Sequence, residues 1–264
     1  MNTAGGPELD LHVHTTASDG TLDLDEVPAA ARRAGVTTVA VTDHDRLHPG
    51  IDTPVTTRDG IRLIRGVELR VDAGDQRVDL LGYAVETGTG LDDELARLQR
   101  NRIERGRAIV DCVEDETGVT LDVDLADGIG RPHVARAVEA SEAPYDYQGA
   151  FDHLIGNDCP CYRARDLPTF EYGHELLAEA CAVVALAHPF RYPDVAGALD
   201  LARAVGGVER YYPYDRPVAT ERVERVAREA GLVRTGGSDA HDRVLGRAGL
   251  DGEEARTFLA RLDE

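Results

Sequence analysis

The chain has 264 residues, of which 49 are acidic and 29 are basic, so its formal net charge is −20. This length suits one large domain, or one domain that carries an insertion. A hydrophobic fraction of 42% can fill a sizeable core, which excludes wholesale disorder. No run of about 18 apolar residues is present, and residues 1–10 lack the pattern of a signal peptide. We therefore expect a soluble cytoplasmic protein without a membrane span.

The basic residues are all arginine, because the sequence contains no lysine. Acid excess without lysine or tryptophan resembles the composition of proteins from extreme halophiles. Salt at 1 M shortens the Debye length to roughly 3 Å, so a carboxylate-rich surface stays hydrated while its self-repulsion is screened. The alternative is an ordinary acidic protein encoded by GC-rich codons, which also enrich arginine.

Net charge also restricts the partners of the chain. A charge of −20 argues against a broad surface for duplex DNA or for an anionic membrane. A local cationic pocket is still compatible with this charge, because bound metal ions invert the sign of a site. The sequence does not indicate an oligomeric state.

Four cysteines occur, at positions 112, 159, 161 and 181. Cys159 and Cys161 lack the two-residue spacer of a zinc knuckle or a redox pair. Because disulfides are rare in the cytoplasm, we expect ordinary reduced cysteines.

The first third of the chain alternates short apolar runs with one amphipathic stretch. In chain order the pattern predicts a strand over 9–13, a helix over 24–34, and strands over 38–41, 61–71 and 78–85. The last two strands flank a turn that contains Gly74, so they form a candidate hairpin.

The middle of the chain, about residues 86–165, is mostly helical in pattern. A long charged helix is predicted over 91–116, and shorter helices over 132–140 and 147–154. We interpret this stretch as a helical insertion that caps a single domain over 1–264.

Beyond residue 165 strands and helices alternate again. The pattern predicts helices over 170–180, 195–204, 218–230 and 253–262, separated by strands over 183–187, 208–212 and 232–235. Strands that alternate with helices favour a parallel α/β sheet or barrel.

Histidines and acids gather at the ends of the predicted strands. His12 and His14 are two residues apart and so share one face of a strand. Such strand ends are the usual location of a site on an α/β barrel. Imidazole with carboxylate favours manganese, iron or zinc over magnesium, and the number of ligands fits two or three ions. The other strand-end candidates are His44, Glu68, His188, Asp239 and His241.

These motifs resemble those of the polymerase and histidinol phosphatase (PHP) family. The matching segments are DLHVH at 10–14, SDG at 18–20, TDHD at 42–45, GVE at 66–68, AHP at 187–189 and GSDAH at 237–241. Further segments resemble the stand-alone branch that acts on nucleotides and RNA: LGY at 81–83, GRPH at 130–133, HPFRY at 188–192 and GGSD at 236–239. The resemblance covers nearly the whole chain.

The resemblance implies an α/β fold, a distorted (β/α)7 barrel with a helical insertion, and a cluster of two or three divalent metals. The branch usually has a histidine where this chain has Asp79, which either ligates through oxygen or leaves the third site weak or empty. The implied ligands are His12, His14, Glu68 and Asp239 for one metal, Asp19, His44 and His241 for a second, and His188 with Asp79 for a third.

Three residues outside the metal set are candidates for binding the substrate. Arg131 and Arg191 are candidate phosphate clamps, since a guanidinium fits a phosphate bidentately, although either is alternatively a surface arginine. His133 either faces the substrate or belongs to a helix start, because Pro132 suits a first turn.

The resemblance further implies a metal-dependent phosphoesterase that hydrolyses nucleotides, nucleoside 3′,5′-bisphosphates or short RNA by a metal-bound hydroxide. Mn²⁺ is the expected metal, with Zn²⁺ or Fe²⁺ as alternatives. Arg131 would stabilise the reacting phosphate, and His188, His241 or a bound water would protonate the leaving oxygen. A histidinol-phosphate phosphatase and a non-catalytic regulatory module are the alternative functions.

Overall fold

The computed structural model describes residues 6–262 of the chain, which divides into two compact units. The first unit comprises residues 1–93 and 167–264, and the second comprises residues 94–166. The second unit overlaps the stretch that the sequence marks as a helical insertion. Within residues 6–262, no helix combines the length and the apolar character that crossing a bilayer requires.

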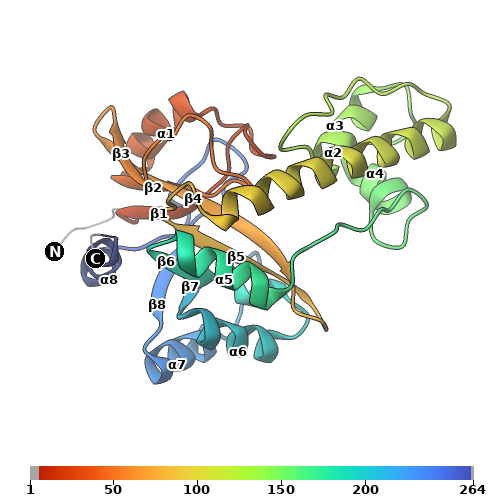
Figure 1. Ribbon diagram of the computed structural model, residues 1–264. Helices are drawn as coiled ribbons and strands as arrows, with labels where there is room; N and C mark the ends of the chain where they lie inside the picture. Colours follow the sequence, from red (N-terminus) through yellow and green to blue (C-terminus); the bar gives the residue numbers. More distant parts are fainter. Residues whose placement is uncertain (1–5, 263–264) are drawn as a thin grey trace. The chain divides into compact units, whose positions relative to one another are not determined.

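A single mixed sheet forms the centre of the first unit (Figure 1). Its strand order is β1-β2-β4-β5-β6-β7-β8, and β3 pairs with the first four residues of β4. The strands are β1 (Leu9–Val13), β2 (Thr38–Val41), β3 (Val55–Arg58), β4 (Ile61–Asp72), β5 (Arg77–Tyr83), β6 (Val183–Leu186), β7 (Gly207–Tyr211) and β8 (Val233–Gly236).

The pairing of the strands is parallel at both ends of this order and antiparallel in its middle. β1, β2 and β4 are parallel neighbours, as are β6, β7 and β8. β5 is antiparallel to both β4 and β6. The expected α/β class and the expected hairpin of β4 and β5 are therefore confirmed. The antiparallel pairs arise because a short turn reverses the chain between β4 and β5, which excludes a parallel crossover there.

The sheet curls until its first strand meets the segment that follows its last strand. Val13 forms a parallel bridge with Ala240, and Leu9 forms an antiparallel bridge with Leu250. Residues that follow β1 and β8 are thereby brought to one place, although they are more than 200 positions apart in sequence.

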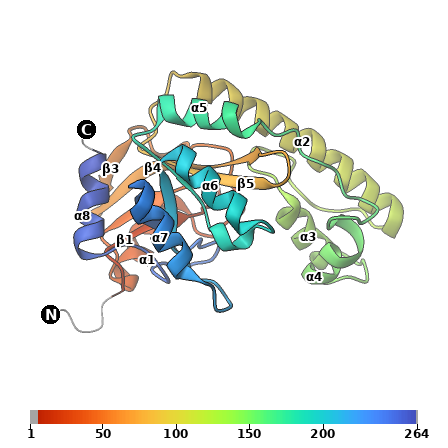
Figure 2. The ribbon, with the colours of Figure 1, turned by 90° about the horizontal axis from the view of Figure 1, so that it is seen from below.

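Helices cover the sheet of the first unit. α6 and α7 lie side by side over β6 and β7, α5 packs on β4 and β6, and α8 packs on β8 (Figures 1 and 2). The helices are α1 (Val27–Ala34), α5 (Phe170–Ala180), α6 (Val195–Val205), α7 (Thr220–Ala230) and α8 (Gly252–Arg261), with 3-10 turns η1 (Leu24–Glu26) and η3 (Pro189–Arg191).

The second unit is helical and has its own apolar core. The long helix α2 (Gly90–Thr117) begins in the first unit and continues into the second. It is followed by α3 (Arg131–Ala140), α4 (Tyr147–Ala150) and the π-helix η2 (Phe151–Ile155). The buried residues of this core include Val113, Val134, Val138, Leu154 and Ile155.

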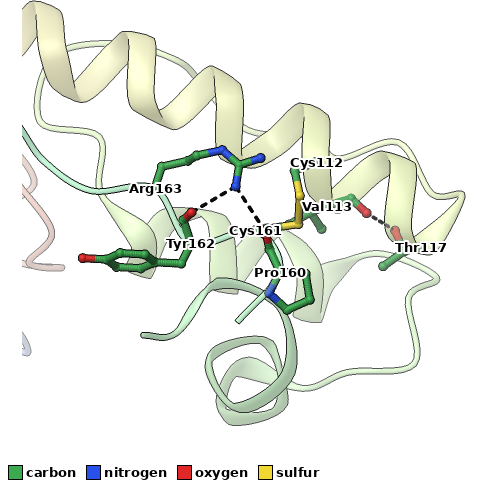
Figure 3. The surroundings of a disulfide bond; sticks show 7 residues. All are labelled: Cys112, Val113, Thr117, Pro160, Cys161, Tyr162 and Arg163. Carbon is green, nitrogen blue, oxygen red and sulfur yellow. Dashed lines mark hydrogen bonds between the residues drawn. A yellow bond between two sulfur atoms is a disulfide. The ribbon is translucent and has the colours of Figure 1, made fainter. Parts of the chain in front are cut away.

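A disulfide joins Cys112 of α2 to Cys161 inside the second unit (Figure 3). The expectation that all cysteines are reduced is therefore wrong for this pair. Both residues belong to the same apolar cluster, which brings their Cα atoms to 5.5 Å, within disulfide range. Cys159 and Cys181 are free, as expected.

Candidate metal centre

Strand β1 and the residue that directly follows it supply two imidazoles to the same face of the sheet. Because side chains alternate along a strand, His12 and His14 point one way while Leu11 and Val13 pack into apolar clusters. Both histidines are fully buried. Gly237 makes room for β1, since a Cβ atom there would lie 2.3 Å from the backbone nitrogen of His12.

The other site residues lie where strands end and the backbone turns sharply. His188 follows β6 with a φ of +26°, and Asp239 follows β8 with a φ of +48°. Such positive φ values are costly for residues other than glycine and cluster at functional sites. His44, after β2, forms a parallel bridge with Glu68 of β4. These turns aim the ring and carboxylate groups at one point.

Glu68 lies at the centre of four imidazoles. Its Oε1 atom is 3.0 Å from Nε2 of His188 and 3.5 Å from Nε2 of His12. Its Oε2 atom is 2.8 Å from Nδ1 of His44 and 3.4 Å from Nε2 of His14. The carboxylate is 1% exposed. Each oxygen therefore faces a different pair of rings, so this carboxylate could contribute to an ion held by either pair.

Asp239 completes the same cluster from the loop after β8. Its Oδ1 atom lies 3.2 Å from Nε2 of His14 and 3.4 Å from Nε2 of His12. Its Oδ2 atom accepts hydrogen bonds from Arg191 Nη1 at 3.0 Å and from the Tyr212 hydroxyl at 2.8 Å. One oxygen thus faces the imidazoles while the other is held by donors at the pocket wall.

A second cluster forms around Asp19. Its Oδ1 atom lies 3.2 Å from Nε2 of His241 and 3.8 Å from Nε2 of His44. The loop that carries Asp19 is held by buried Asp43, which accepts hydrogen bonds from the hydroxyls of Thr15 at 2.7 Å and Ser18 at 2.6 Å. Asp43 therefore positions the loop that carries Asp19.

Among residues 6–262, three overlapping groups of side chains could each hold a metal ion. Their ligand atoms lie within 4.8 Å of one another. Nε2 of His12 and both ring nitrogens of His14 are buried without a hydrogen-bond partner, and such atoms are costly to leave unsatisfied. Divalent cations would satisfy them, so the donor set fits metal. The groups are His14, Asp19, His44 and His241; His12, His14 and Asp239; and His12, Glu68 and His188.

The protonation of His14, Glu68 and Asp239 suits metal ions, whereas His12, whose pKa Glu209 and Asp239 raise against the effect of burial, must give up a proton to an ion. Burial, together with the neighbouring rings of His241 and His44, lowers the pKa of His14 to about 4, so this ring is neutral near pH 7. Burial opposes ionisation of Glu68 and Asp239, but the surrounding histidines outweigh it and hold both carboxyl pKa values well below their usual range. Neutral imidazole and ionised carboxylate are the forms that ligate metal.

Glu209 of β7 is a site residue that the sequence reasoning missed. It is buried, its Oε1 atom lies 3.0 Å from Nδ1 of His12, and its Oε2 atom accepts the backbone N–H of His188 at 2.7 Å. The sequence gives little signal for it, because Glu209 is one of two adjacent charged residues in β7, beside Arg210.

Asp79 is placed differently from the other candidate ligands. It lies outside all three groups, with its Oδ2 atom 3.8 Å from Nε2 of His188 and 3.2 Å from Nη1 of Arg70. Its backbone N–H donates to the Tyr192 hydroxyl at 2.9 Å. Arg70 was also missed from the sequence, and Tyr192 was noted only as the last residue of the HPFRY motif.

The acidic and basic groups surround a hollow of about 280 Å³. Arg191 lines this hollow and also a second one of about 450 Å³, whose wall includes Phe190, Tyr212 and Tyr214. The first hollow is lined by Asp19, His44, Glu68, Arg70, Asp79, His188, Arg191, Tyr192, Asp239 and His241.

Arg131 and His133 belong to the second unit, at the start of α3. Nη1 of Arg131 donates to the Asn157 side chain at 3.2 Å, and its guanidinium lies 5.7 Å from the Phe151 ring centre. Nδ1 of His133 accepts the backbone N–H of Gly130 at 3.2 Å, as in a helix start. Their roles toward a substrate stay predictions.

Comparisons with known proteins show similarity in sequence and in fold. The sequence matches the PHP domain over residues 10–231. A phosphoribosyl 1,2-cyclic phosphate 1,2-diphosphodiesterase of Eggerthella lenta is 30% identical over 252 residues, covering 89% of this chain and 94% of that protein. A 3′,5′-nucleoside bisphosphate phosphatase of Chromobacterium violaceum is 28% identical over 195 residues, covering 70% of this chain and 67% of that protein. The solved structure of a candidate metal-dependent phosphoesterase from Bifidobacterium adolescentis superposes with a TM-score of 0.80 at 24% identity, over 97% of this chain and 96% of that one.

Proposed function

Because this chain belongs to the PHP domain family of metal-dependent phosphoesterases, we propose that it hydrolyses nucleotides, nucleoside 3′,5′-bisphosphates or short RNA. The observation that carries this proposal is the position of Glu68 between four imidazoles at one side of an open pocket. The similar proteins act on a cyclic phosphate or a bisphosphate, both of which are phosphate esters. We also infer that the curled sheet is the distorted (β/α)7 barrel of the family, and that the protein works in the cytoplasm.

Two sets of residues suit divalent ions. His12, His14 and Asp239 would hold one ion; Asp19, His44 and His241 would hold another; and Glu68 reaches toward both sets. When bound, such ions supply Lewis-acid charge and lower the pKa of water, which makes it a nucleophile toward phosphorus. The mixture of imidazole and carboxylate ligands favours Mn²⁺, with Zn²⁺ or Fe²⁺ as alternatives.

Side chains of the pocket wall would bind the phosphate and deliver a proton. The Arg191 side chain is 55% exposed and is fixed by Asp239, so its remaining N–H groups are available to phosphoryl oxygens. Two imidazoles are candidates for protonating the leaving oxygen. The side chain of His241 is 37% exposed and that of His188 is 4%, but His241 also belongs to the set that would hold the second ion, so it could donate a proton only when it is not a ligand.

The second hollow supports a leaving group with a planar ring. Phe190, Tyr212 and Tyr214 contribute aromatic side chains to it, and bases stack readily on such side chains. Arg191 lines both this hollow and the first one. A nucleotide whose phosphate occupies the first hollow would place its base in the second.

Phosphate release from defined substrates tests the proposal. The protein, purified in molar KCl and loaded with Mn²⁺, would be offered adenosine 3′,5′-bisphosphate, a short RNA and histidinol phosphate. We expect release from the first two, lost on chelation and in His14→Ala, and retained in the matched control His174→Ala on α5. Preferred release from histidinol phosphate would favour the alternative phosphatase. No release from any substrate by protein that holds two metals would favour a non-catalytic module.

A further inference from the structure

Arg70 and Asp79 face each other across the β4–β5 hairpin, inside the metal pocket. The two residues are direct partners in the register of the strands. Nη1 of Arg70 lies 3.2 Å from Oδ2 and 3.3 Å from Oδ1 of Asp79. Asp79 is buried, whereas the Arg70 side chain is 39% exposed and lines the pocket. The carboxylate is therefore engaged by a guanidinium that still faces the substrate side.

The three ligand groups do not amount to three independent metal sites. His12 belongs to two of them, and so does His14. Since Nδ1 of His12 is held by Glu209, only its Nε2 atom is left for an ion. Once His12 and His14 serve an ion with Asp239, a further ion near His188 would have to rely on one oxygen of Glu68 and on Asp79.

Asp79 is poorly placed to complete such a site. Asp79 belongs to none of the three groups whose ligand atoms lie within 4.8 Å of one another, although its Oδ2 atom lies 3.8 Å from Nε2 of His188. An ion held by Asp79 would also lie beside the guanidinium of Arg70, and two positive charges this close repel each other. The Arg70 guanidinium already neutralises the negative charge of Asp79, which would otherwise attract a cation.

We propose that the Arg70–Asp79 pair closes the His188 side of the centre to a third ion, so that this chain holds two divalent ions and presents Arg70 to the phosphate of the substrate. This inference rests on the proposed function, because it concerns the same pocket. The planar guanidinium supplies fixed positive charge and directional N–H donors at the place where a third cation would otherwise act. Two divalent ions still outweigh the carboxylates of Asp19, Glu68 and Asp239, so the pocket keeps attracting phosphate.

Metal content tests the first half of the proposal without any measurement of activity. The full-length chain and its variants would be loaded with Mn²⁺, separated from excess metal by gel filtration, and analysed by mass spectrometry for ions per chain. We expect two ions in the wild type and in Asp79→Asn. The double variant Arg70→Gln with Asp79→His, which has an imidazole and no guanidinium at this place, should hold three.

Two results would overturn this half of the proposal. Three ions in the wild type with two in Asp79→Asn would identify Asp79 as a ligand. A count of two ions in the Arg70→Gln, Asp79→His double variant, with circular dichroism unchanged, would show that the ion pair is not what excludes a third ion. A wild type without bound metal would instead contradict the proposed metal-dependent function itself.

Phosphate binding tests the second half. The double variant Arg70→Gln with Asp79→Asn removes both charges of the pair and liberates no carboxylate. Its affinity for inorganic phosphate, measured by calorimetry on the Mn²⁺-loaded protein, should fall about tenfold to hundredfold, the usual effect of one charge-assisted hydrogen bond. Asp79→Asn alone and the exposed control Arg33→Gln should retain phosphate binding. Arg70→Lys should retain part of it. Unchanged phosphate affinity in the double variant at a metal count of two would overturn the role of Arg70.

Discussion

Glu209 holds the Nδ1 side of the His12 ring at 3.0 Å, which leaves Nε2 of the same ring facing Glu68 and Asp239. Carboxylates in this position fix the tautomer and the orientation of a ligating histidine and raise its basicity. The second oxygen of Glu209 accepts the backbone N–H of His188, so one buried side chain also supports the strained turn after β6. Glu209 thus positions two parts of the centre without facing the ions.

Glu209→Gln should lower the affinity for Mn²⁺ about tenfold to hundredfold, the usual effect of losing such a supporting carboxylate. The amide preserves the size of the side chain but removes the charge that stabilises the orientation of His12. Calorimetric titration with Mn²⁺ measures the change, with the exposed Glu179→Gln as the matched control. Wild-type affinity in Glu209→Gln would show that the packing around His12 orients its ring without the carboxylate.

The affinity for metal should rise with pH. Burial opposes a charged ring at His12, but Glu209 and Asp239 outweigh it and raise the pKa of His12 well above its ordinary value of 6.5. In the metal-free protein this ring is therefore protonated near neutral pH, and an ion must displace its proton. Below that pKa, affinity should increase about tenfold per pH unit for each proton released. His14, with a pKa of about 4, is already neutral and adds no such dependence above about pH 5.

Titration with Mn²⁺ between about pH 6 and pH 8, in two buffers of different ionisation enthalpy, counts the released protons directly. Loss of most of the pH dependence in Glu209→Gln would connect it to His12. An affinity that is independent of pH in the wild type would contradict the expected protonation of this ring.

The strand ends that carry the candidate ligands could be predicted from the sequence, because they follow local rules. His12 and His14 share a face through the two-residue period of a strand, and Asp239 and His241 repeat that spacing. Burial and turn chemistry act over a few neighbouring residues, so they leave a visible pattern. The α/β class and the hairpin before α2 follow from the same kind of pattern.

Other features depend on contacts between distant parts of the chain and leave little trace in the sequence. In the sequence, Glu209 resembles any acidic residue in a strand. Only the folded sheet brings it next to His12 of β1. Strand β3 has a polar, half-exposed sequence, so no apolar pattern marks it. The Cys112–Cys161 pair is separated by 49 positions, and only the packing of the second unit brings the two sulfurs together. Spacing along the chain carries no information about such pairs.

Reduction of the Cys112–Cys161 disulfide should destabilise the second unit. A cross-link that closes a loop of 49 residues restricts the unfolded chain, and the chain-entropy model assigns it about 4 kcal/mol. Urea unfolding with and without a phosphine reductant measures the effect, and Cys112→Ser should reproduce it without reductant. Cys159→Ser is the control, since this cysteine is free. Equal stability of the oxidised and reduced protein would show that the apolar core alone determines the stability of this unit.

Salt should stabilise the folded chain. The sign of the effect tells whether repulsion between carboxylates or attraction within exposed ion pairs dominates at the surface. The 49 acidic residues exceed the 29 arginines, so unpaired carboxylates repel one another, and added ions screen that repulsion. Exposed ion pairs such as Arg247–Asp242 have the opposite dependence, but each contributes little. We therefore expect the midpoint of thermal unfolding to rise with KCl. For a large domain, a gain of about 2 kcal/mol corresponds to roughly 4–8 °C.

Calorimetry on the metal-free protein from about 0.01 M to 1 M KCl separates this screening from the general effect of concentrated salt, because the Debye length falls from about 30 Å to about 3 Å over that range. If repulsion dominates, most of the rise occurs below about 0.1 M, where the Debye length is still shortening toward 10 Å. Equimolar sucrose, which carries no charge, should not reproduce that early rise. A midpoint that falls with KCl would mean that ion pairs such as Arg58–Asp25 outweigh the repulsion, and the acidic composition would then have no stabilising role in salt.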